Sequence, residues 1–427
     1  MLGLSLVLIS ALYLLVIQKL SRKGLNKNSF TVSEAFILGH WPFLFLNGLI
    51  LEVTGGREWT SIGLYEAADF ATALFVVGAA LVCYIMGGNV ALKKYRVGIS
   101  DTSQKSNVWN VRDRDVKVLF IIGIITTILG VYASWVNLDI VQNELLGRGD
   151  RSKAMLALSK LLVPGAILLF IVFVTIRKSI FIKWFSLALS IFAAVAITWG
   201  WSRTPFLVTI GASYMVYSFL SKGEISRKRI YLLIPFFIAF AVFLLIYRIS
   251  VTYGISVDDF ASNGAILFYM NKLWLDSSAF SAMLIIIKEY GLMNFEGGES
   301  FIAPLFFWMP SDIFEFKPRG FFLNQALDVD YTIGPSLYGE AIVNFSVIGL
   351  FPLLFVIGYL FKKIDLSFQS KQQSLFALYA YTILMMNVIF LVRGAFYPIV
   401  APILIEIFIP LALLFVLRSI ALLKIRQ

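Results

Sequence analysis

The sequence has one cysteine, Cys83, and one histidine, His40, and both lie inside long apolar runs. A single cysteine cannot form a disulfide within the chain or a thiolate metal cluster. With a single histidine, the sequence argues against structural zinc and against a histidine-based catalytic dyad. We therefore expect no metal and no other cofactor, and we expect His40 to form a hydrogen bond between packed helices.

Charged residues are also scarce, at 14% of the chain, whereas 59% of the residues are hydrophobic. A soluble globular protein carries about a quarter charged residues. Neither GxxxxGK[ST] nor a GxGxxG following a strand occurs, so no nucleotide site is expected. The apolar residues come in runs of roughly 16 to 22, long enough for a helix to cross a bilayer. The runs do not alternate in polarity, as barrel strands would.

These features predict an all-α polytopic membrane protein, folded as a single integral-membrane domain over residues 1–427, whose environment is the lipid bilayer. We expect eleven membrane spans, at residues 2–18, 33–51, 68–87, 117–136, 157–176, 183–199, 205–221, 230–248, 340–361, 374–392 and 397–417. The net charge of +11 would suggest nucleic acid in a soluble protein. Here it is better explained by cytoplasmic loops, so we expect no nucleic-acid partner.

Lysine and arginine are distributed unevenly between the two sets of loops. When loops are assigned alternately, 24 of the 36 basic residues fall on the side of residues 19–27. Cytoplasmic loops carry such an excess, so this side is expected to be cytoplasmic. The N-terminus is then outside and the C-terminus inside. The first apolar run has its basic residues after it, so we expect it to remain as a membrane helix rather than a cleaved signal peptide.

The longest loop, residues 249–339, precedes the last three spans and is expected on the outer, periplasmic face. It contains a helix-like run, Phe268 to Tyr290, followed by a stretch in which aromatic residues and prolines alternate with polar residues. This composition predicts an ordered structure with helices on the membrane surface.

Arginines on the outer side are the main candidates for substrate binding, because the positive-inside tendency disfavours them there. They are Arg148, Arg151, Arg203, Arg248, Arg319 and Arg393. A guanidinium group binds pyrophosphate through two parallel hydrogen bonds and keeps its charge in a low-dielectric site. The alternative is that they anchor helix ends at headgroups or pair with nearby acids. Arg203 and Arg393 lie in short loops, which fixes their depth, and we expect them to share one outward cavity.

Glu340 is the leading candidate for a catalytic carboxylate. It follows Tyr338 at the expected outer N-terminal end of a span, where the helix dipole favours an anion. It could bind sugar hydroxyls or act as a general base, or it could simply cap the helix. Asp312, Glu315, Asp328 and Asp330 compete for the same role. Glu406, in the middle of the last span, indicates either a functional polar pathway or a structural hydrogen-bond network.

The chain resembles the O-antigen polymerase (Wzy-type) family of oligosaccharide repeat-unit polymerases. The likeness rests on Ser202-Arg203 opening a span, the long late outward loop with Pro304 and Pro310, the stretch PSLYGEAIVNFSVIGL, and the outward Arg393. Some members carry an arginine followed by glycine eleven residues later, and no outward arginine here has that spacing.

The resemblance implies a fold like that of the integral-membrane (GT-C) glycosyltransferases and a place in the bacterial inner membrane, in lipopolysaccharide O-antigen biosynthesis. A growing glycan on undecaprenyl pyrophosphate would be transferred to an incoming lipid-linked repeat, with a flippase and a chain-length regulator as partners. For this reaction we expect Glu340, Arg203 and Arg393 to be catalytic, and Arg148, Arg151, Arg248, Arg319 and Tyr338 to bind substrate. Two alternatives are an O-antigen ligase-like glycosyltransferase, whose outward catalytic histidine is missing here, and a flippase or transporter, which the long loop disfavours.

Overall fold

The computed structural model describes residues 2–26, 29–41, 67–98, 113–145, 153–199, 203–222, 224–235, 279–289, 291–293, 295, 297–306, 336–370, 373–394 and 396–423. Within these ranges the secondary structure is helical and contains no strand, apart from an isolated bridge between Ser29 and Ser226. Six described helices are long and apolar enough to cross a membrane, and Leu8–Ser21 and Leu375–Leu391 are shorter apolar helices. The chain is therefore a multi-pass α-helical membrane protein.

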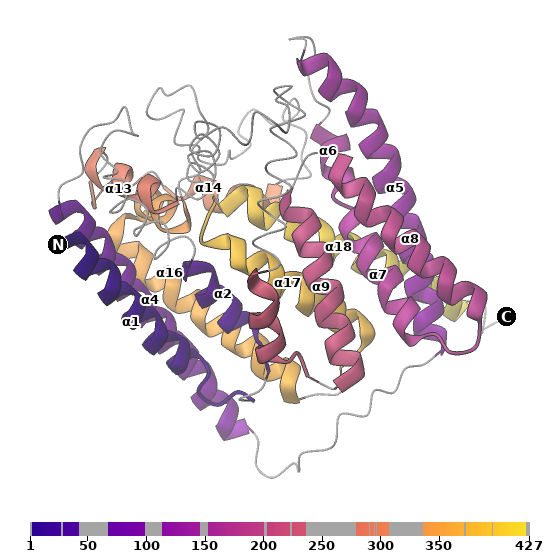
Figure 1. Ribbon diagram of the computed structural model, residues 1–427, viewed down its shortest axis with the longest axis horizontal. Helices are drawn as coiled ribbons and strands as arrows, with labels where there is room; N and C mark the ends of the chain where they lie inside the picture. Colours follow the sequence, from indigo (N-terminus) through magenta and orange to yellow (C-terminus); the bar gives the residue numbers. More distant parts are fainter. Residues whose placement is uncertain are drawn as a thin grey trace.

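The helices form two groups joined by a central set (Figure 1). The first group contains α1 (Leu2–Ser21), α2 (Val32–His40), α4 (Ala67–Gly98) and α16 (Ser336–Ser370), and α4 packs along α16. The second contains α5 (Asp113–Leu145), α6 (Lys153–Ser159), α7 (Leu162–Thr175) and α8 (Ile180–Trp199). Between them lie α9 (Arg203–Lys222), α17 (Leu375–Leu391) and α18 (Phe396–Leu423).

Three short elements lie at one end of this bundle: α13 (Ala279–Glu289), α14 (Glu299–Ile302) and the 3-10 helix η2 (Ala303–Phe306). They belong to the long loop expected outside the membrane, and they contact the ends of α16 and α18 at that end. Of the helix-like run at 268–290, the structure describes residues 279–289, and these are helical.

The helix bounds agree with most expected spans and extend several of them. Helix α4 continues to Gly98 and α5 to Leu145, so residues 88–98 and 137–145, which the sequence analysis assigned to loops, are helical. Two expected spans contain irregular residues: the candidate span Ala157–Thr175 includes the turn between α6 and α7, and α16 has a non-helical residue at Ser346. Parts of the expected spans 33–51 and 230–248 lie outside the described residues.

The contact between α4 and α16 depends on glycines facing the partner helix. A Cβ atom at Gly87 would overlap the carbonyl oxygen of Phe355, and one at Gly358 would overlap the carbonyl oxygen of Tyr84. Small residues let helix backbones approach closely, which is how membrane helices gain packing energy without a hydrophobic driving force between them. The two glycines therefore allow the short distance between the backbones of α4 and α16.

Candidate functional site

The N-terminal segment of α16, residues 336–345, is a ten-residue helical segment set off by two serines with unusual backbone angles. Ser336 has φ 60° and Ser346 has φ 58° with ψ 175°. Such conformations cost about 1–3 kcal/mol in a residue other than glycine and persist only where the surroundings enforce them. Each serine also caps the helix that follows, since Ser336 Oγ accepts from the backbone N–H of Gly339 and Ser346 Oγ from that of Ile348.

Glu340 lies within this segment and is fully buried. Its Oε2 accepts a hydrogen bond of 2.5 Å from the backbone N–H of Phe396, the first residue of α18. The carboxylate therefore sits at the N-terminus of a second helix, where the exposed N–H groups and the helix dipole favour an anion. Among the described residues, no hydrogen bond reaches the other oxygen, Oε1, and Ser300 lies beside the carboxyl group.

Residues 298–306 pack against the segment that carries this carboxylate. Asn344 Nδ2 donates to Ser300 Oγ at 2.9 Å and to the carbonyl of Glu340 at 2.7 Å. The ring of Phe301 stacks on that of Phe396, with centroids 4.5 Å apart, and also contacts Phe345. The N-terminal segment of α16, the start of α18 and the α14–η2 region thus form one packed unit around Glu340.

Tyr338 connects the same segment to α2. Its hydroxyl lies 2.6 Å from Nε2 of His40, and Nδ1 of His40 lies 2.8 Å from the carbonyl oxygen of Phe36. A carbonyl oxygen only accepts, so Nδ1 carries the proton and Nε2 accepts from the tyrosine hydroxyl. Both side chains are buried. The interhelical hydrogen bond expected of His40 is present, and Tyr338 is its partner.

The predicted arginines are only partly described. Arg393 lies in the turn between α17 and α18, three residues before Phe396, and its side chain is half-buried. Arg203 is the first residue of α9, but its side chain lies outside the described residues. Arg148, Arg151, Arg248 and Arg319 also lie outside them, as do the four rival acids in the long loop. The structure therefore brings together Glu340, Tyr338 and the turn that contains Arg393.

A second polar cluster, which the sequence analysis missed, lies around Glu34 in the first turn of α2. Glu34 is fully buried, and its carboxylate accepts from Arg22 at 2.5 Å and from Arg227 at 2.8 Å. The hydroxyl of Tyr231 donates to the same carboxylate. The sequence feature that could have predicted this cluster is an acidic residue at the start of an apolar run that follows a basic loop.

A second carboxylate, that of Asp365 on α16, binds the N-terminus of α2. It accepts from the backbone N–H groups of Val32 and Ser33 and from the hydroxyl of Tyr381 at 2.8 Å. Asp365 is 25 positions after Glu340 on α16, which at 1.5 Å per residue places the two carboxylates roughly 35 Å apart along the chain. The two clusters therefore lie at opposite ends of the bundle.

Glu406 occupies the middle of α18 and takes part in a hydrogen-bond network. Its Oε2 accepts from Nδ2 of Asn387 at 3.2 Å, and its backbone carbonyl accepts from the hydroxyl of Tyr379. Lys160, between α6 and α7, lies near enough for its charge to interact with the carboxylate. Within the part of the chain that the structure describes, no group of three or more histidine, cysteine or acidic side chains is placed to hold a metal ion.

The helices and their composition define the class of this chain as a multi-pass α-helical membrane protein with a buried carboxylate where two helices begin. No family model, no curated protein and no solved structure matches the chain.

Proposed function

We propose that the chain is a polymerase of undecaprenyl-pyrophosphate-linked oligosaccharide repeat units, acting at the outer face of the bacterial inner membrane. The observation that carries this proposal is Glu340, whose carboxylate is fixed through Oε2 and has no hydrogen bond at Oε1 among the described residues. A fixed carboxylate with one unused oxygen is suited to accept a proton from a sugar hydroxyl.

In the proposed reaction, Glu340 removes the proton from the acceptor hydroxyl of the incoming lipid-linked repeat. The hydroxyl oxygen forms a bond to the anomeric carbon of the growing glycan, and the bond from that carbon to the undecaprenyl pyrophosphate breaks. The pyrophosphate leaves with the electron pair, and guanidinium groups stabilise its developing charge. Arg393, in the turn three residues before Phe396, and Arg203 at the start of α9 are the proposed groups.

The surrounding contacts fit a positioning role. The Tyr338–His40 hydrogen bond ties the N-terminal segment of α16 to α2, and the Phe301–Phe396 stack connects the neighbouring α14 to α18. A general base must be held within hydrogen-bond reach of its substrate, and these two anchors limit the movement of Glu340 in two directions.

The test is a Glu340→Gln variant, which keeps the size of the side chain and an oxygen that can accept from Phe396 but cannot take up a proton. Purified protein in liposomes would be given lipid-linked repeat units, and chain extension followed by mass. We expect the rate of extension to fall by about 10²- to 10⁴-fold. Glu299→Gln, an exposed acid on the neighbouring α14, is the matched control and should extend chains normally. Equal rates for both variants would remove Glu340 from the mechanism.

A carrier of the same lipid-linked oligosaccharide is the second candidate, because helices broken within the membrane often surround substrate sites in transporters, and α16 is broken at Ser346. The liposome experiment separates the two functions. A carrier moves labelled substrate across the bilayer without changing its mass, whereas a polymerase produces longer glycans. A ligase-like enzyme would produce no longer glycans from lipid-linked repeats alone. It would transfer the glycan only when a separate, non-polyprenyl acceptor is supplied.

A further inference from the structure

A carboxylate and an ammonium group lie near one another inside the helix bundle and have no part in the proposed glycan transfer. Glu406 is on α18, ten residues after Phe396, and is 2% exposed. Lys160, in the turn between α6 and α7, is half-buried, and its charge acts on the Glu406 carboxylate. Both positions fall within candidate membrane spans, Ala157–Thr175 and Ile399–Ser419. Ionisable side chains are costly at such depth and mark the paths of ions and protons in membrane proteins.

Neutral groups of α17 hold Glu406 in place. Its Oε2 accepts from Nδ2 of Asn387 at 3.2 Å, and the same amide donates to the carbonyl oxygen of Ile383 at 3.1 Å. The Glu406 carbonyl accepts from the hydroxyl of Tyr379. That carbonyl lacks its usual donor four residues on, because Pro410 has no backbone N–H. The position of the carboxylate is therefore fixed by contacts that do not depend on its charge.

The Lys160 ammonium is not fixed by direct contacts. Within the described residues it forms no hydrogen bond and no ion pair, so it attracts the Glu406 carboxylate across a gap. Lys160 also lies where its span is interrupted, since α6 ends at Ser159 and α7 begins at Leu162. In membrane transporters, interrupted helices often surround the sites of coupling protons or sodium ions.

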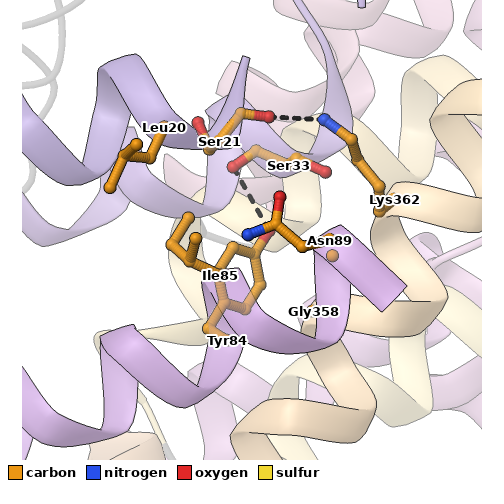
Figure 2. A pocket seen from close by; sticks show the side chains of 9 residues that line it. Leu20, Ser21, Ser33, Tyr84, Ile85, Asn89, Gly358 and Lys362 are labelled. Atoms are coloured by element: carbon orange, nitrogen blue, oxygen red, sulfur yellow. Dashed lines mark hydrogen bonds between the residues drawn. The ribbon is translucent and has the colours of Figure 1, made fainter. Parts of the chain in front are cut away.

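Lys362 illustrates how a lysine with a structural role differs from Lys160. Its ammonium donates to the carbonyl oxygen of Ser21 at 2.7 Å, at the edge of a small cavity (Figure 2). The Asp365 carboxylate acts on its charge from the same helix. Lys362 is thus held by a direct hydrogen bond, whereas Lys160 is held by electrostatic attraction alone.

Lys160 and Tyr379 are the titratable groups that interact with Glu406. Other charged groups on elements that pack against α18 lie toward its two ends, near Phe396 or near Arg418. These ends are ten and twelve residues from Glu406, roughly 15 and 18 Å along the helix. The groups at the first end are Glu299, Glu340 and Arg393, and the group paired with Arg418 at the other end is Asp115.

We propose that Glu406 is a proton-exchange site inside the membrane and that Lys160 is its electrostatic partner. In the ionised state, the attraction between the two charges holds the α6–α7 turn toward α18. One proton from water then forms an O–H bond with the carboxylate, which becomes neutral, and nothing is oxidised or reduced. The Lys160 ammonium loses its attraction to α18, and its long side chain turns toward the surface of the bundle. A proton gradient can thereby act on the contact between these helices.

The ligand is a proton rather than a metal cation, because Lys160 places a positive charge beside the single carboxylate. A metal cation would keep its own charge next to that ammonium, whereas a proton removes the charge of the carboxylate. Sodium ions should therefore not compete with protons at this site.

The experiment is infrared difference spectroscopy of the purified full chain in liposomes as the pH of the buffer is changed. A protonated carboxyl group has a C=O band that the ionised form lacks. We expect this band to grow on acidification in the wild-type protein, to shift in deuterated water, and to lose one component in Glu406→Gln. Lys160→Met should move that component to a pH about one unit higher, because the charge that favours the ionised carboxylate is lost.

Lys183→Met is the matched control, because this lysine is also half-buried but lies over the ring of Phe173 at the start of α8. It should leave the band at the wild-type pH. If Lys160→Met does not fold, the deuterium shift of the Glu406 component decides. The proposal is overturned if Glu406→Gln removes no pH-dependent component, if that component does not shift in deuterated water, or if Lys160→Met and Lys183→Met behave alike. Loss of the band on adding sodium ions at constant pH would indicate a metal-cation site and would also overturn it.

Discussion

The hydroxyl of Tyr338 donates a hydrogen bond to Nε2 of His40 across 298 residues of sequence. This contact fixes the N-terminal segment of α16 against α2, two residues before Glu340. It also explains the structural role of His40, the only histidine of the chain, because both of its ring nitrogens now have a hydrogen-bond partner.

Replacing Tyr338 with phenylalanine should destabilise the protein, because Nε2 of His40 is left buried without a donor. The expected loss is about 1–3 kcal/mol in the free energy of unfolding. Thermal or denaturant unfolding in detergent measures it, and Tyr132→Phe, an exposed tyrosine on α5, should have little effect. A loss no greater in Tyr338→Phe than in Tyr132→Phe would contradict the assigned hydrogen bond.

Glu34→Gln should be more damaging, since it leaves Arg22 and Arg227 without their shared carboxylate. Removing one partner from a buried ion pair costs about 3–5 kcal/mol. Glu224→Gln, at a partly exposed carboxylate that accepts from Asn26, should cost less than about 1 kcal/mol. Adding Arg227→Gln to Glu34→Gln should restore part of the stability, because it removes one of the two uncompensated charges. No recovery in the double variant would argue against this electrostatic account.

Gly87→Ala should reduce the yield of folded protein, because the added methyl group overlaps the Phe355 carbonyl and pushes α4 from α16. Overpacking of this kind costs about 1–3 kcal/mol. The adjacent Gly88→Ala is the control, since a Cβ there would meet Gly358 at 3.6 Å, an ordinary contact. Size-exclusion profiles and unfolding temperatures of the two variants should differ clearly, and equal behaviour would count against the proposed close approach.

Arg393→Ala and Arg203→Ala should shorten or abolish glycan ladders in complemented cells at equal membrane expression. Each loses a charge-assisted interaction of about 1.5–3 kcal/mol with the lipid pyrophosphate. Lysine at either position keeps the charge but loses the paired donors, so an intermediate ladder is expected. Arg177→Ala, at an exposed arginine after α7, should leave the ladder normal. Normal ladders from both alanine variants would leave the arginine assignment without support.

The sequence predicted a multi-pass α-helical membrane protein because apolar length limits where a helix can cross, but six described helices, against eleven expected spans, are long and apolar enough to do so. Helix α17 begins after the N-cap Ser374, and its observed bounds, Leu375–Leu391, lie inside the predicted span 374–392. The same reasoning placed Glu340 at the start of a span, and the structure has it in the first turns of α16.

The contacts of the site could not be predicted, because they join residues that are remote in sequence. Nothing local indicates that Glu340 accepts from Phe396, or that Glu34 pairs with Arg227. The break at Ser346 was missed for a related reason: neither proline nor glycine occupies that position, and the break is held by packing and by the bond from Val347 to Leu292.

The glycine contact between α4 and α16 also bears on how the protein is made. Helix α4 ends at Gly98 and α16 begins at Ser336, so residues 99–335 are synthesised between them. At ordinary translation rates this takes on the order of ten to fifty seconds. During that interval the face of α4 around Gly87 has no partner from α16. Helices α4 and α16 can therefore pack together only late in biogenesis. Nascent chains that stop before residue 336 cannot form this contact.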